Sequence, residues 1–320
     1  MTFLLGSRGS ALARWQADYV RSRLEAVHPG LRVEVRIVRT TGDRITDVPL
    51  ARIGDKGLFT KEVDQVVLSG EVHAAVHSFK DVPTRLPDGL TVAAVLERED
   101  PRDAFVTAPG RASTLEALPP GATVGTSSLR RRAQLLRLRP DIVVEDLRGN
   151  LDSRLERVKA GDRYDAAILA LAGLRRLGRQ AEVARILEPP AWLPAVGQGA
   201  LAVVARDDDA TTRAYLAALD HPATRAATAA ERAFLHALEG GCQIPIGALA
   251  TARGERLRLH GFVAALAGTP FLEADAEGPA SAPDDLGRAL AAELRARGAD
   301  DVLRDVRAQA DSILPHASAP

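Results

Sequence analysis

The fold class is indicated near the N-terminus by residues 3–38, FLLGSRGSALARWQADYVRSRLEAVHPGLRVEVRIV. Residues 3–5 form a short apolar run, residues 11–27 have a helical pattern, and residues 33–38 are apolar again. A strand, a helix and a second strand in this order predict a βαβ unit with a parallel sheet. The alternation continues outward with a helix at 60–68 and strands at 74–77 and 90–95. This part of the chain therefore predicts one α/β lobe.

A second lobe is predicted after a charged, proline-containing break at residues 97–103, EREDPRD, which is typical of a hinge. The alternation then resumes, with strands near Val124 and at 142–144 and 166–169, and helices at 128–138 and 151–159. The proline-rich residues 188–194, EPPAWLP, end this lobe. Residues 200–205 predict a buried strand, but the sequence does not indicate its neighbours in a sheet.

The last third of the chain predicts a small α+β domain. It begins after a linker near His221-Pro222. An alanine-rich helix to Leu238, strands near Ala248 and at 257–265, and a final helix at 283–297 follow. The predicted fold is therefore two α/β lobes of the periplasmic-binding-protein kind, joined by a hinge, with a third α+β domain.

Composition supports this division and excludes several classes of partner. A chain of 320 residues exceeds what one hydrophobic core usually supports, so two or three domains are expected. The 42 basic and 42 acidic residues cancel, which argues against nucleic acid or an anionic membrane as a partner. No run of about 18 apolar residues occurs, and residues 1–6 lack the basic region and longer apolar stretch of a secretion leader. We therefore expect a cytoplasmic enzyme.

Cys242 is the only cysteine, so the chain forms no internal disulfide and has no cysteine-based metal site. It lies in residues 238–247, LEGGCQIPIG, a glycine-flanked loop after a predicted helix. Two hypotheses remain open for it. Lone cysteines are more often buried and inert. The glycines instead favour an exposed thiol that a large group approaches closely, which suits covalent attachment.

Arginine and serine residues recur where predicted strands run into helices. This occurs in LLGSRGS (residues 4–10), GTSSLRRR (125–132) and DLRGNLDSR (146–154). Helix N-termini bind anions, and guanidinium groups pair with carboxylates through two hydrogen bonds. A serine-capped, solvated helix is the alternative at each junction taken alone. Three such junctions at the carboxyl ends of strands favour a polyanionic ligand.

Asp81 follows another predicted strand, in VHSFKDVP (residues 76–83). A carboxylate surrounded by cations stays ionised, and it can stabilise a developing positive charge and transfer a proton. The alternative is a plain surface pair between Lys80 and Asp81. His73 and His77 cannot share a metal, because four residues of a strand span about 13 Å. We expect no metal site.

Residues 197–202, GQGALA, imitate a dinucleotide fingerprint. Pro194 precedes them, however, and a predicted strand rather than a helix follows. We therefore do not interpret this motif as a nucleotide-binding site.

Taken together, these segments resemble the porphobilinogen deaminase (hydroxymethylbilane synthase) family. The resemblance covers nearly the whole chain, to about Leu303. It is carried, in the family's order, by HSFKDVP (77–83), EREDPRDAF (97–105), VGTSSLRR (124–131), RGNLDSR (148–154), LPAVGQGAL (193–201), AERAFL (230–235) and LEGGCQIPIG (238–247). Phe79, where the family commonly has methionine, and Ser153, where threonine is common, are small departures.

The resemblance implies a transferase of tetrapyrrole (haem) biosynthesis. It implies that Cys242 holds a dipyrromethane cofactor through a thioether and that four porphobilinogen molecules are added to this primer. Each loses ammonia to give an electrophilic azafulvene, which the terminal pyrrole attacks, and hydrolysis finally releases hydroxymethylbilane. Because each pyrrole carries two carboxylates, the growing chain is the polyanion that the arginines would neutralise.

The resemblance also implies roles for individual residues. Asp81 is the expected catalytic carboxylate. The expected binders of cofactor carboxylates are Lys80, Ser128, Arg130, Arg131 and Arg154. Those expected to hold the incoming ring are Arg8, Ser10 and Arg148, with Phe59 as a stacking group at the base of a lid formed by residues 42–57, which include Lys56.

The family's organisation implies three domains and a monomer. Domain 1 comprises residues 1–98 and 199–217, domain 2 residues 103–193, and domain 3 residues 221–320. Two rival hypotheses predict no covalent cofactor: a two-lobed anion-binding module, and a thiol hydrolase that pairs Cys242 with His236. No feature of the sequence supports the second pairing.

Overall fold

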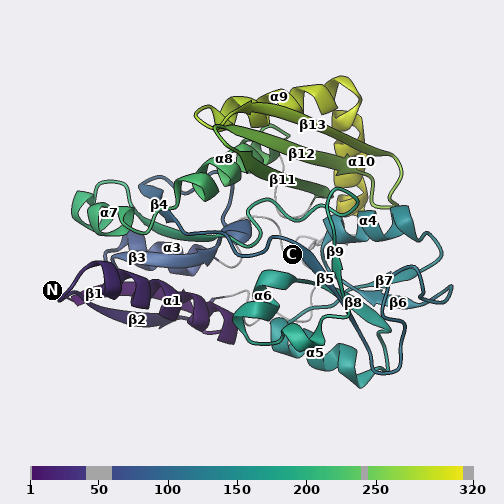
Figure 1. The fold of residues 1–320 in the computed structure, drawn as a ribbon, viewed down its shortest axis with the longest axis horizontal. Coiled ribbons are helices and arrows are strands. Elements are labelled where there is room, and N and C mark those ends of the chain that lie inside the picture. Colours follow the sequence, from purple (N-terminus) through teal and green to yellow (C-terminus); the bar gives the residue numbers. More distant parts are fainter. Residues whose placement is uncertain (1, 41–59, 239–243, 313–320) are drawn as a thin grey trace, which may run out of the picture.

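The computed structural model describes residues 2–40, 60–238 and 244–312. Figure 1 shows two lobes side by side, with the third domain lying across both. The first lobe contains β1 (Thr2–Arg8), α1 (Ala11–Val27), β2 (Arg32–Val38), α3 (Lys61–Leu68), β3 (Ala74–Ser78), the 3₁₀ turn η2 (Phe79–Asp81), β4 (Leu90–Val95), β10 (Leu201–Arg206) and α7 (Ala210–Ala217).

The sheet of the first lobe has the strand order β2-β1-β3-β10-β4. Strand β1 is parallel to β2 and β3, as the sequence predicts, but β10 is antiparallel to both β3 and β4. The predicted parallel pairing is therefore present, and the strand at 200–205, whose neighbours the sequence left open, runs antiparallel within the same sheet. Helix α1 packs against one face through Val20 and Leu24, and α3 covers the other through Val63 and Val67.

The second lobe repeats this arrangement with the strand order β7-β6-β8-β5-β9. Strand β6 is parallel to β7 and β8, while β5 is antiparallel to β8 and β9. Its elements are β5 (Asp103–Thr107), β6 (Thr123–Gly125), α4 (Leu129–Leu138), β7 (Val143–Glu145), α5 (Leu151–Ala160), β8 (Ala166–Ala170), α6 (Leu171–Arg176), the 3₁₀ turn η3 (Gln180–Glu182) and β9 (Arg185–Leu187).

The third domain is a three-stranded antiparallel sheet covered by helices. It contains α8 (Pro222–Ala237), β11 (Ile246–Arg253), β12 (Arg256–Ala264), β13 (Phe271–Pro279), α9 (Pro283–Ala296) and α10 (Ala299–Ser312). Phe234 of α8 and Leu290 of α9 lie in its core, fully buried. The helix predicted at 283–297 is not the final one, because α10 follows it after a turn at Gly298. The β13 strand was also not predicted.

Two chain segments connect the lobes, residues 96–102 and 188–200, and they lie side by side. The Leu96 amide donates to the Leu201 carbonyl (3.0 Å), and the Glu99 amide donates to the Gly199 carbonyl (3.2 Å). Gly199 has φ +90°, and a Cβ there would lie 2.2 Å from the Glu99 carbonyl oxygen, so only glycine fits. Asp103, predicted in the hinge, is instead the first residue of β5 and is fully buried.

Helix α8 begins at Pro222, with the His221 side chain as its N-cap. The predicted linker near these residues is therefore short, because a proline at the first position of a helix helps to start it. Arg98 of the hinge pairs with the fully buried Glu231 of α8 through two hydrogen bonds (2.6 and 3.1 Å). This buried pair joins the third domain to the hinge.

The third domain also contacts the second lobe. Arg137 of α4 donates two hydrogen bonds to Glu273 of β13 (3.1 and 3.0 Å), and its guanidinium lies 3.8 Å from the centre of the Phe271 ring.

None of the helices in the described ranges combines the length and apolar character that crossing a membrane requires.

Candidate active site

Asp81 lies at the carboxyl edge of the first sheet. Strand β3 ends at Ser78, and the chain then turns through η2, in which Phe79 is buried and Asp81 is partly exposed. The Phe79 amide donates to the Ala200 carbonyl (3.0 Å), which ties the turn to the segment that connects the lobes. Pro83 prevents the turn from continuing as a helix. The sequence therefore presents one carboxylate at the end of a central strand.

Lys80 is the first cation beside this carboxylate. Its Nζ donates to Gln198 Oε1 (3.2 Å). Burial, reinforced by the positive charge of Arg131, lowers the pKa of Lys80 from 10.5 to about 8, although Asp81 and Asp103 act in the opposite direction. The ammonium is therefore poised to bind an anion, whose charge would raise this pKa again.

Two further cations lie at the start of α4, where the Ser128 hydroxyl accepts from the Arg131 amide as the N-cap (3.5 Å). Arg130 and Arg131 are both buried, and they donate to opposite oxygens of Asp103 (2.8 and 2.7 Å). Burial alone would raise the pKa of Asp103, but the two arginine charges hold it well below its usual range. Asp103 is therefore an ionised anchor for both arginines.

Asp103 accepts two further hydrogen bonds, from Trp192 Nε1 (2.8 Å) and Gln198 Nε2 (2.9 Å). The sequence did not single out these three residues, although EREDPRDAF contains Asp103, EPPAWLP contains Trp192 and LPAVGQGAL contains Gln198. Trp192 and Gln198 lie 89 and 95 residues after Asp103 in the chain, so no local pattern signals these contacts. The GQG motif therefore contacts the other connecting segment and the start of β5, through Gly199 and Gln198.

Two more cations, Arg148 and Arg154, lie just before α5 and in its first turns. Gly149, with φ +105°, turns the chain, and Asn150 caps the helix through the Ser153 amide (3.0 Å). Arg154 Nε donates to the Gly149 carbonyl (2.7 Å). Burial, together with the charges of Arg131 and Arg148, lowers the pKa of Arg154 to about 10.

The residues predicted from separate motifs are therefore brought together across the two lobes. Arg154 of lobe 2 is close enough to Asp81 of lobe 1 for the carboxylate to raise the pKa of Arg154. In the same way, Arg131 and Arg130 of lobe 2 are close enough to Lys80 of lobe 1 to lower the pKa of Lys80. Arg148 is also buried, which lowers its pKa. Five cations therefore lie near the two carboxylates Asp81 and Asp103. An anionic ligand would neutralise this local excess of positive charge. The five are Lys80, Arg130, Arg131, Arg148 and Arg154.

Arg8 and Ser10 lie at the carboxyl end of β1, on the same sheet edge as Asp81. The Ser10 hydroxyl accepts from the Ala13 amide as the N-cap of α1 (3.3 Å). Gln16 of that helix donates to the Ser78 hydroxyl at the end of β3 (2.9 Å). Cys242, Phe59 and the predicted lid at 42–57 lie outside the described residues.

A polycarboxylate cofactor fits the buried arginine pair. Within the described part of the chain, the Nε atoms of Arg130 and Arg131 are buried without a hydrogen-bond partner, as is the Ser127 hydroxyl. Buried donors without partners are costly, and a ligand that accepts from them removes that cost. Dipyrromethane, with several carboxylates, supplies suitable acceptors.

The two histidines occupy separate environments. His73 Nδ1 accepts from the Leu4 amide (2.9 Å), whereas His77 Nε2 lies 3.3 Å from Asp64 Oδ1 in the interior. Across residues 2–40, 60–238 and 244–312, no three His, Cys, Asp or Glu side chains are arranged to hold a metal ion.

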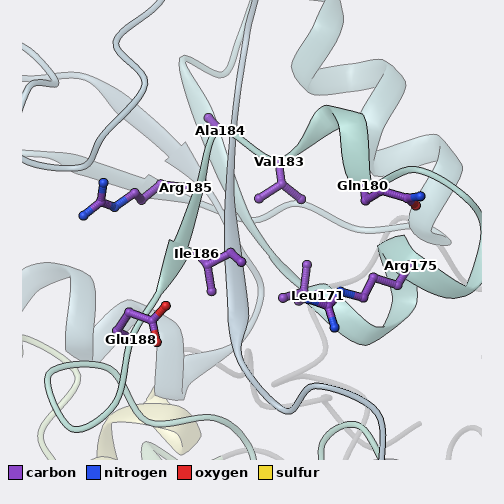
Figure 2. A pocket seen from close by; sticks show the side chains of 8 residues that line it. All are labelled: Leu171, Arg175, Gln180, Val183, Ala184, Arg185, Ile186 and Glu188. Carbon is purple, nitrogen blue, oxygen red and sulfur yellow. The ribbon is translucent and has the colours of Figure 1, made fainter.

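A hollow of about 450 Å³ lies elsewhere on the second lobe (Figure 2). It is lined by Leu171 and Arg175 of α6, by Arg185 and Ile186 of β9, and by Gln180, Val183, Ala184 and Glu188 beside them. None of the cations described above lines this hollow, so it is separate from the Asp81 site.

Comparison with known proteins agrees with this arrangement. Residues 3–214 match the family model "Porphobilinogen deaminase, dipyromethane cofactor binding domain", and residues 226–296 match "Porphobilinogen deaminase, C-terminal domain". The chain belongs to the porphobilinogen deaminase family. Membership confirms the resemblance found in the motifs and makes the chain a transferase of tetrapyrrole biosynthesis that uses a dipyrromethane cofactor.

Curated members of the porphobilinogen deaminase family match almost end to end. The protein of Nitratidesulfovibrio vulgaris is 47% identical over 97% of this chain and 98% of its own, and that of Methylobacillus flagellatus is 48% identical over 98% of each. The protein of Desulforudis audaxviator is 50% identical over 96% of this chain and 98% of its own. Among solved structures, a methionine-bound nutrient binding protein from Burkholderia cenocepacia is 14% identical, with a TM-score of 0.42 over 67% of this chain and 89% of its own.

Lys80 gives the first testable prediction. In the Cys242→Ala variant, which lacks the attachment sulfur, we expect one lysine to titrate near pH 8, because burial lowers the pKa of Lys80 to about 8. Since Lys56, Lys61, Lys80 and Lys159 are the only lysines, ¹³C-labelled lysine gives an NMR spectrum simple enough to follow each one. The signal should disappear in Lys80→Arg and shift to higher pH in the cofactor-loaded protein. A Lys80 signal that is unchanged by loading would contradict its contact with cofactor carboxylates.

Proposed function

We propose that this chain joins four porphobilinogen molecules on a dipyrromethane attached to Cys242, with loss of ammonia at each addition, and then releases hydroxymethylbilane by hydrolysis. The observation that carries the proposal at residue level is the cluster of buried cations around Asp81, to which both lobes contribute. The dipyrromethane, when bound, supplies the pyrrole carbon to which the first substrate ring is joined.

The binding residues divide into two groups in this proposal. Lys80, Ser128, Arg130, Arg131 and Arg154 hold the cofactor carboxylates. Arg8, Ser10 and Arg148 hold the acetate and propionate of the incoming ring, and Phe59 stacks on it. The proposed division is supported by position: the first group lies around Asp103 and Asp81, while Arg8 and Ser10 lie at the end of β1.

Asp81 carries the chemistry that this chain itself supplies. When the bond between the substrate's methylene carbon and its amine breaks, ammonia leaves and the ring becomes cationic. A carboxylate fixed beside the ring nitrogens stabilises that positive charge and can receive a proton.

The thioether to Cys242 can be tested by intact-protein mass. We expect the purified protein to exceed the mass of its chain by one dipyrromethane and to give a pink colour with an aldehyde reagent for pyrroles. Cys242→Ala should abolish both signals, because no other cysteine exists to hold the group.

His236→Ala is the matched control, and it should retain the full mass increment. An unmodified wild-type chain would instead favour the anion-binding module, which needs no covalent group. A hydrolase activity lost in both Cys242→Ala and His236→Ala would favour the thiol hydrolase.

We also propose the three-domain division at 1–98 with 199–217, 103–193 and 221–320, and a monomer in the cytoplasm. The placement of β10 in the first sheet supports the two-part first domain. Family membership supports the proposed monomer and the proposed cytoplasmic location. Sedimentation of the loaded protein at several concentrations tests the monomer.

A further inference from the structure

Arg232 of helix α8 holds the turn that carries Asp81. Its Nη1 donates to the Val82 carbonyl (2.9 Å), and its Nη2 donates to the Pro83 carbonyl (2.5 Å). The guanidinium carbon also lies 4.6 Å from the centre of the Phe79 ring. One side chain of the third domain therefore contacts the residues on both sides of Lys80 and Asp81.

Other contacts also hold the turn, because the Phe79 and Val82 side chains are buried in one cluster with Ala200 and Ala202. Apart from the Phe79 amide bond to Ala200, its own short-range bond runs from the Val82 amide to the Phe79 carbonyl (3.2 Å). Pro83 has no amide hydrogen to donate. The fork of the Arg232 guanidinium adds, from the third domain, a two-point restraint on where the chain leaves Asp81.

Helix α8 itself is held rigidly at this point. Glu231, the preceding residue, is fully buried and accepts from Arg98 of the hinge and from the amides of Gly197 (2.8 Å) and Ala250 (2.9 Å). On another side, a Cβ at Gly287 would lie 2.4 Å from the Ala230 carbonyl, which shows how closely α9 packs. The backbone of α8 at Arg232 is therefore held in place by the contacts of its neighbours.

We propose that Arg232 is a positioning residue for the reaction, through which helix α8 sets the place of Asp81 at the edge of the first sheet. The helix that precedes the Cys242 loop in the sequence would then also set the position of the catalytic carboxylate. This inference rests on the role proposed for Asp81. Displacing a reacting group by about 1 Å can cost about 100-fold in rate, so loss of this restraint should affect turnover more than binding.

The test compares Arg232→Gln with Arg225→Gln. Arg225 is on the same helix and likewise donates to two carbonyls of the first lobe, those of Val92 and Ala93 (3.4 and 3.2 Å), but these belong to β4. We expect Arg232→Gln to lower kcat by about 100-fold with KM changed by less than about threefold. Arg225→Gln should keep kcat within about twofold at a comparable loss of thermal stability. Both variants should retain the dipyrromethane mass increment.

Lysine substitutions extend the comparison if Arg232→Gln fails to fold. Arg232→Lys keeps the charge but replaces the planar fork by a single ammonium, so kcat should fall by about tenfold. Arg225→Lys should leave kcat unchanged. Equal losses of kcat at positions 232 and 225, or an unaffected kcat in the position 232 variants, would overturn the inference.

The Asp81→Ala variant distinguishes a failure of the positioning role of Arg232 from a failure of the catalytic role proposed for Asp81. If Asp81→Ala abolishes turnover while Arg232→Gln does not lower it, the positioning role fails and the role of Asp81 stands. If Asp81→Ala turns over normally, the role of Asp81 fails first, and the inference about Arg232 fails with it.

Discussion

Asp81→Ala is expected to lower the turnover of porphobilinogen by about 10³-fold while leaving the fold intact. Removing one preorganised group that stabilises transition-state charge commonly costs about 10²–10³-fold, and Asp81 is the one catalytic carboxylate that we propose. Side-chain truncation should be tolerated structurally, because Asp81 is partly exposed and the turn is held by backbone bonds. Single-turnover release of ammonia measures the effect directly.

Asp88→Ala is the matched control for this prediction. Asp88 is an exposed carboxylate in the same lobe, between η2 and β4, and its removal should leave turnover unchanged. Near-normal rates for Asp81→Ala, in a protein that carries the full dipyrromethane increment, would refute the role assigned to Asp81.

The largest loss of stability is expected from Asp103→Asn. At neutral pH this change leaves two buried guanidinium groups, those of Arg130 and Arg131, without their shared negative charge. Breaking a buried pair by removing one partner typically costs about 3–5 kcal/mol in the free energy of unfolding. Urea denaturation at pH 7 measures this loss.

The sign of the pH dependence follows from the lowered pKa of Asp103. Its stabilising contribution is present above the unfolded-state pKa of about 3.9 and is lost only as the pH falls through the lower folded-state pKa. The difference between wild type and Asp103→Asn should therefore persist from pH 7 to about pH 4. Asp275→Asn, which breaks an exposed pair with Arg258, should change stability little. Equal effects at positions 103 and 275 would contradict the anchoring role of Asp103.

Much of the fold could be predicted from the sequence because its signals are local. The pattern at residues 11–27 coincides with α1, and that at 90–95 coincides with β4. Strand pairing is not local. No local pattern indicates that β5 and β10 run antiparallel within otherwise parallel sheets, because tertiary packing decides which strands they pair with.

The candidate site shows the same division. Lys80, Arg131 and Arg154 could be found because each follows a strand and sits in a recognisable motif, and the structure brings them together. Asp103 and Arg232 could not be assigned in this way. Asp103 acts through four partners, two from α4 and two from residues 188–200, and Arg232 donates to a carbonyl 150 residues away in sequence.

The crossing of the chain between lobes has a consequence for synthesis on the ribosome. All five strands of the second sheet lie between Asp103 and Leu187, so that sheet can close as soon as this segment emerges. The first sheet must wait, because β10 fits between β3 and β4 and ends only at Arg206. The lobe that is made first is therefore completed second. Until β10 is added, the facing edges of β3 and β4 stay unpaired, and unpaired strand edges on a nascent chain are prone to aggregation.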